Sequence, residues 1–220
     1  MRTPLVLGLI WLTAALIPSQ AAQESDRPRL SATQTPYLSC TVWDGREWTR
    51  PAAGLVQTPV IQSPKGSRAY AEVKVVIENG ACVNTTTLYI ANAVVKKTVY
   101  IKSGGGNGIQ IVGWSPNGDE LLAEVNLWKY ETDTGYDHVA VLYDASSEST
   151  IEIPELNHAL LEQFGSHCEF ERTIQGWKDD EQILVKVSKS PADASYEQHF
   201  CVERQRIFVF NLQSKALRKY

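Results

Sequence analysis

The sequence lacks the features that mark several large functional classes. It has no block of Lys or Arg residues, and its formal net charge is −4, so it offers no electrostatic footprint for nucleic acid or anionic lipid. It has no Cys-x-x-Cys spacing, which argues against a structural zinc site. Its N-terminal apolar run, residues 5–17, is shorter than the roughly 20 residues that a membrane-spanning helix needs.

The N-terminus has the layout of a secretory signal peptide. Arg2 precedes the apolar run and small residues follow it, which predicts a signal peptide over residues 1–21. An uncut N-terminal membrane anchor is the alternative. We expect a secreted or periplasmic protein with no stable membrane insertion after cleavage. Residues 22–36 are polar, contain two prolines and predict a flexible leader.

The remaining residues, 37–220, predict one all-β domain. Segments rich in β-branched and aromatic residues are separated by clusters of Gly, Asn, Ser and Pro. These strands repeat as sets of four, in units that span approximately residues 55–102, 109–153 and 168–220. In each unit a strand runs into a polar turn and an alternating strand returns. Four strands in a repeat of roughly 40 to 60 residues are typical of propeller blades.

The second unit has the clearest turn, at residues 113–119. It contains Trp114, Ser115, Pro116, Gly118 and Asp119, and an apolar strand follows it. These residues resemble the Trp-Ser-Pro-Asp-Gly turn that precedes an apolar strand in the blades of the TolB-type propeller repeat. Asn117 stands where the family usually has aspartate, the first unit keeps only Ser-Pro-x-Gly, and the third keeps Trp177 and an acidic pair. The resemblance implies a sheet repeat and no particular activity.

The residues of this turn have predictable physical roles. Pro116 fixes φ and Gly118 can adopt positive φ, so a tight turn should join the first two strands of the unit. Trp114 ends the first strand, where its ring should fill the space between neighbouring blades. Apolar residues then alternate along the next strand and should face a core: Leu121, Ala123 and Val125.

Three units are fewer than the four to eight blades with which propellers close. The sequence therefore predicts a propeller-like array of about three four-stranded antiparallel blades. This array is either open or closed by a second copy of the chain in a homodimer. Exposed strand edges would need a cover, from the N-terminal segment, a helix or a second chain. Residues 37–48 leave room for part of a fourth unit.

One segment departs from the β pattern. Residues 154–165 predict a short inserted helix, because apolar residues recur at helical spacing between a proline and a glycine. The apolar stripe consists of Leu156, Leu160, Leu161 and Phe164. We expect it to pack on the core or to cover an edge.

Two features concern covalent modification. Four cysteines in an exported chain favour two disulfides, and four cysteines allow three pairings. Cys82 and Cys201 each follow the second strand of their unit, which favours the pairings Cys40–Cys82 and Cys168–Cys201 over free thiols. Asn84 begins an Asn-Thr-Thr acceptor sequence for glycosylation.

No set of residues forms a recognisable catalytic, cofactor or metal motif. The glycine-rich run 103–108 is followed by a strand and lacks the lysine of a phosphate loop, which indicates a loop between units. Ser115 lacks the glycine pattern of a nucleophile elbow and is assigned to the turn. The acidic loop 130–137 lacks the regular ligand spacing of a calcium loop. The weak site candidates are Asp133, Asp137, His138 and His199.

These patterns favour an exported, non-enzymatic β-repeat protein that binds a protein partner or an unknown ligand without a cofactor. Two alternatives stay open. One is a hydrolase or hydrolase accessory with a site at the mouth of the propeller, which convergence of the four weak candidates in one pocket would support. The other is a structural envelope component.

Overall fold

The computed structural model describes residues 42–43, 48–49, 54–78, 81–91, 95–103, 106–127, 137–166, 168, 170–189 and 202–220. The predicted signal peptide and leader lie outside these residues. Within them, no helix is both long enough and apolar enough to span a membrane.

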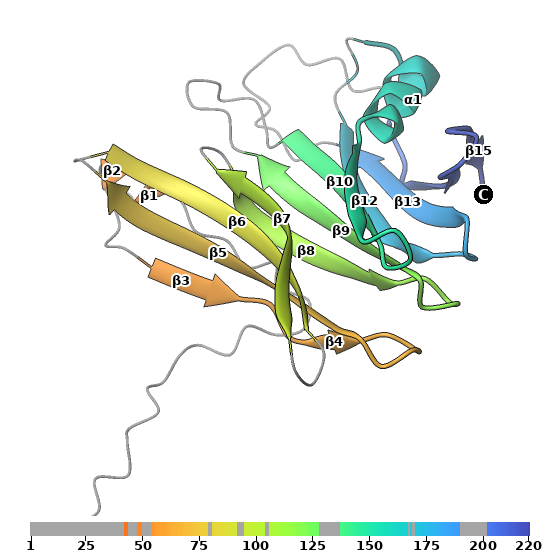
Figure 1. Cartoon of the computed structure of the whole chain (residues 1–220). Helices are drawn as coiled ribbons and strands as arrows, with labels where there is room; N and C mark the ends of the chain where they lie inside the picture. The colour runs from red at the N-terminus through yellow and green to blue at the C-terminus, as the bar shows by residue number, and fades with distance from the viewer. Residues whose placement is uncertain are drawn as a thin grey trace, which may run out of the picture.

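Three antiparallel sheets stand side by side, which confirms the predicted all-β array (Figure 1). The first sheet contains β3 (Gly54–Gln57), β4 (Ile61–Gln62), β5 (Arg68–Glu78), β6 (Ala81–Ala91) and β7 (Lys96–Ser103). The second contains β8 (Gly106–Trp114), β9 (Glu120–Leu127), β10 (Asp137–Asp144) and β11 (Ser149–Ile153). The third contains β12 (Phe170–Trp177), β13 (Gln182–Lys189), β14 (Arg206–Asn211) and β15 (Leu217–Lys219).

Each of these sheets is four strands wide. The first sheet has five strands but the same width, because β3 and β4 pair with successive parts of β5. A separate hairpin pairs β1 (Val42–Trp43) with β2 (Trp48–Thr49). Among the described residues, no strand pairing joins the first sheet to the third. The array is therefore open within the described part of the chain.

Two hydrophobic clusters hold the sheets together. The cluster between the first and second sheets contains Ala69, Ala71, Val73, Leu88, Ile109, Leu121, Ala123, Val125, Val141 and Tyr143. The cluster between the second and third sheets includes Leu122, Leu142, Ile153, Ile183, Val185, Val187, Phe208 and Phe210. The prediction that alternate residues of β9 face a core is thus confirmed. The intervening Leu122 is also buried, because β9 lies between two sheets.

The predicted helix is confirmed as α1 (Glu155–Phe164). Leu156 and Leu160 are buried in the cluster between the second and third sheets, and Phe164 packs against it. Leu161 is exposed. Most of the apolar stripe therefore serves as core packing between two sheets.

The first strand of each unit has an irregularity at the same place. The register between β8 and β9 shifts between Ile111 and Gly113, and that between β12 and β13 shifts between Ile174 and Gly176. Both glycines adopt positive φ, 147° and 151°, and a tryptophan follows each. In the first sheet, the break between β3 and β4 occupies the corresponding position. A bulge that recurs in this way is a structural feature of the repeat.

Candidate functional site

The turns that follow the first strands contact one another at one end of the array. Lys65 in the first turn forms an ion pair with Asp119 in the second. The backbone N–H of Asn117 in the second turn donates to the carboxylate of Asp180 in the third, at 2.8 Å. A carboxylate of each later turn therefore holds the turn before it.

The second turn has the roles that the sequence predicts. Gly118 has φ of +78°, and a Cβ there would lie 3.2 Å from Cδ of Pro64 in the first turn. Ser115 is buried, its hydroxyl donates to Oδ1 of Asn117 at 2.7 Å, and its oxygen accepts from the N–H of Glu120 at 3.0 Å. Ser115 is therefore a structural turn residue.

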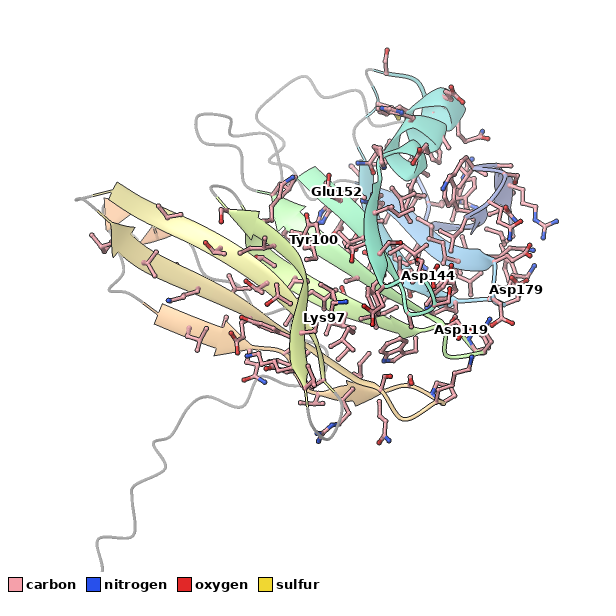
Figure 2. All side chains as sticks on the ribbon, viewed as in Figure 1. Lys97, Tyr100, Asp119, Asp144, Glu152 and Asp179 are labelled. Atoms are coloured by element: carbon pink, nitrogen blue, oxygen red, sulfur yellow. The ribbon has the colours of Figure 1, made fainter. Side chains whose placement is uncertain are left out.

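Carboxylates gather near these turns, where Figure 2 shows Asp119 and Asp144. Burial, followed by repulsion from Asp144 and Asp119, raises the pKa of Glu120. Hydrogen bonds from Ser146 and Ser147 lower the pKa of Asp144 to about 2. In the described part of the chain, no three His, Cys, Asp or Glu side chains are grouped to hold a metal ion.

A buried polar network crosses the interface between the second and third sheets. Arg172 from β12 is 6% exposed, and its Nη1 forms an ion pair with Glu124 of β9, which is 3% exposed. Its Nε donates to Oδ1 of Asn157 on α1 at 2.7 Å, and its Nη2 donates to the carbonyl of His138 at 2.6 Å. Asn157 also donates to that carbonyl, at 3.0 Å. The guanidinium thus links two sheets and the helix.

Of the four weak site candidates, the structure describes only the side chain of His138. Its Nδ1 lies 2.9 Å from Oδ1 of Asn126, beside the buried network. The side chain of Asp137, like Asp133 and His199, lies outside the described residues, so the convergence that would support the hydrolase alternative is not tested. The sequence reasoning missed Glu124 and Arg172. Glu124 stands within the apolar run of β9, and this isolated charge is the signal from which a buried ion pair could have been predicted.

A polar seam joins the outermost strands of the first and second sheets, and Figure 2 shows three of its members, Lys97, Tyr100 and Glu152. Lys97 of β7 pairs with Glu148 at 2.5 Å, while Tyr100 and Lys102 donate to Glu152 of β11 at 2.8 Å and 3.0 Å. Burial and the bond to Glu152 raise the pKa of Tyr100. The hydrogen bond from Tyr100 is the main cause that lowers the pKa of Glu152.

The face of the first sheet that points away from the second sheet is here called the outer face. The strand register places the following side chains on it: Leu55, Gln57, Arg68, Tyr70, Glu72, Lys74, Thr85, Thr87, Tyr89, Thr98 and Ile101. Leu55 is 49% exposed and Ile101 is 60% exposed. The outer face therefore presents aliphatic, aromatic and charged groups together.

Near one end of β5 and β6, the outer face carries a cation–π cluster. The rings of Tyr70 and Tyr89 stack with centroids 5.1 Å apart. Nζ of Lys96 lies 3.7 Å from the centroid of Tyr89 and 5.0 Å from that of Tyr70. The same ammonium is 3.6 Å from the carboxylate of Glu72. These contacts hold the two rings in one arrangement.

The residues assigned to covalent modification have different settings. Cys168 is buried and, with no free cysteine in the described part of the chain, is not a free thiol. Cys82 belongs to β6, but its side chain, Cys40 and Cys201 lie outside the described residues, so both disulfide pairings stay predictions. Asn84 is only 4% exposed within β6, so its amide is inaccessible to a glycosylating enzyme in the folded protein.

No family model and no curated protein sequence matches the chain. The TolB-type resemblance therefore stays a prediction, as do the export and binding roles inferred from sequence.

Proposed function

We propose that the protein is an exported, non-enzymatic β-repeat module that binds a protein partner through the outer face of the first sheet. The observation that carries the proposal is the exposure of two large aliphatic side chains, Leu55 and Ile101, on either side of the ordered tyrosine pair. Exposed apolar groups within an otherwise polar surface are characteristic of interaction sites.

Comparison with the corresponding faces of the other sheets supports this proposal. In the second and third sheets, the strand after the turn buries apolar residues against the preceding sheet: Leu121, Ala123 and Val125, then Ile183, Val185 and Val187. By strand register, the equivalent residues of the first sheet are Arg68, Tyr70 and Glu72. This composition does not suit burial against another sheet of the same repeat. It does suit a protein interface, where Tyr and Arg are enriched.

We also propose that the protein is exported and its signal peptide is cleaved after residue 21. In the exported protein, Cys40 pairs with Cys82 and Cys168 pairs with Cys201. The buried, bonded state of Cys168 supports the second pairing. The proposal also includes the TolB-type repeat. Turn contacts and bulges that recur at equivalent positions support that assignment.

Site-specific photo-cross-linking in cells that export the protein tests the binding role. A photoreactive residue replaces Thr98, which is exposed on the outer face, or, as the control, Glu171, which is exposed on the far face of the third sheet. We expect one discrete cross-linked protein species from position 98 and none from position 171. Equal adducts at both positions, or none at either, would contradict the proposal.

A further inference from the structure

We infer that the partner of the outer face is a protein segment that is acidic and carries aliphatic side chains; this inference rests on the proposed function. Among the described side chains, the outer face and its border carry three cations, Arg68, Lys74 and Lys96, against one carboxylate, Glu72. The whole chain has a formal net charge of −4, so the described side chains of this face carry net charge of the opposite sign. A face of this sign attracts negatively charged partners and disfavours basic ones.

Two of these cations are available to a partner. Lys96 is committed to Glu72 and the tyrosine rings. Arg68 and Lys74 are exposed and form no ion pair within the described part of the chain. Both lie on β5, six residues apart, which corresponds to about 20 Å along a strand. An extended segment that runs along β5 would therefore meet both cations with acidic residues about six positions apart.

The apolar groups indicate a protein rather than a carbohydrate or a nucleic acid. Sugars and bases use the open faces of aromatic rings, but Lys96 already lies over Tyr70 and Tyr89. Leu55 lies opposite Lys74 in the register, and Ile101 lies opposite Thr87. Aliphatic side chains of a partner would bury Leu55 and Ile101, whereas a sugar would leave them against polar groups.

The same charges argue against a second copy of this chain. In a two-fold dimer the same patch occupies both sides of the interface, so two surfaces of the same net positive charge would be brought together. Such a contact would repel, and a partner of opposite sign is favoured.

Selection from a displayed library of random peptides on mature protein, residues 22–220, tests the inference. The test variant is Arg68→Glu/Lys74→Glu. The matched control is Lys186→Glu/Arg218→Glu, which reverses two cations on the far face of the third sheet. We expect selected peptides to be rich in Asp, Glu and aliphatic residues, and to bind the test variant about tenfold or more weakly while binding the control normally. Circular dichroism checks that both variants are folded.

Other outcomes separate the two proposals. Peptides that bind Arg68→Glu/Lys74→Glu normally but lose binding to Leu55→Asn/Ile101→Asn would overturn the acidic partner and leave the binding face intact. No enrichment, or peptides insensitive to both variants, would overturn both. Tight binding of heparin that is lost in Arg68→Glu/Lys74→Glu, without peptide enrichment, would indicate an anionic polysaccharide and overturn the inference. A concentration-dependent dimer that Leu55→Asn/Ile101→Asn abolishes would indicate a second copy and overturn it as well.

Discussion

The two interfaces between sheets are built from different chemistry on the same strand frame. Between the first and second sheets the buried cluster is apolar, and the ion pairs lie at the exposed rim, as in Lys65–Asp119 and Lys97–Glu148. Between the second and third sheets an ion pair, Glu124–Arg172, is itself buried. The strands are therefore arranged alike at the two interfaces, although one buries apolar contacts and the other also buries an ion pair.

The two equivalent tryptophans show the same difference. Nε1 of Trp177 donates to the carbonyl of Gly113 in the preceding sheet, at 2.9 Å. Nε1 of Trp114 is buried and has no hydrogen-bond partner in the described part of the chain. Both rings pack between sheets, which agrees with the role predicted for Trp114. The first interface therefore lacks a polar link that the second interface has.

The largest expected effect concerns the buried ion pair. Arg172→Ala leaves the Glu124 carboxylate buried without its cation, and we expect it to lower the free energy of unfolding by roughly 3–5 kcal/mol. Urea denaturation measures this loss. The double variant Arg172→Met/Glu124→Leu removes both charges and should recover most of the stability. A loss under about 1 kcal/mol in Arg172→Ala would mean that the pair does not hold the interface.

The second prediction compares two turn glycines. Gly118→Ala should destabilise by about 1–3 kcal/mol, because it forces positive φ on a non-glycine residue and brings Cβ 3.2 Å from Pro64. Gly66 has φ of +90° with nothing within 4 Å, so Gly66→Ala should show the conformational cost without the contact. The difference in thermal midpoint between the two variants measures the contact between turns. Equal losses would show that the close approach has no energetic role.

The third prediction compares the tryptophans. Trp177→Phe removes a buried hydrogen bond and leaves the Gly113 carbonyl without that donor, so it should destabilise by about 1 kcal/mol more than Trp114→Phe. Trp114→Phe removes a donor that has no partner, which offsets part of the lost packing. Urea midpoints of the two variants give the comparison. The reverse order would contradict the difference between the interfaces.

The smallest effect is the acid sensitivity of the first interface. The pKa values of Glu148 and Glu152 are lowered, first by hydrogen bonds from Lys97 and Tyr100 respectively. Their contribution to stability is therefore present above the unfolded pKa of about 4.3 and is lost as the pH falls through the lowered values. The stability difference between wild type and Glu152→Gln should shrink between pH 6 and pH 3. A stability difference that stays constant over this pH range would mean that titration of Glu152 does not cause the acid sensitivity.

The sequence predicts the local features of this fold well, since they depend on neighbouring residues. The helix at 155–164 and the positive φ of Gly118 follow from short patterns around them. The alternation along β9 correctly identifies one buried face. It does not reveal the second, because a strand between two sheets buries both sides.

The features that the sequence does not reveal depend on distant residues. Glu124 and Arg172 are 48 positions apart, and nothing in either strand indicates that the other is its partner. Likewise, the outer face becomes evident only when strand register aligns Arg68 and Tyr70 with the buried Leu121 and Ala123. Comparison of equivalent positions across the repeat identifies it.

The absolute mass of the mature protein in solution tests whether the three sheets form an open array whose outer face is left for a different protein. It is measured by light scattering over a wide concentration range with cysteines oxidised. We expect the mass of one chain at every concentration. A stable dimer that Leu55→Asn/Ile101→Asn converts to monomer would contradict it, because the outer face would then be the surface through which two chains close one ring.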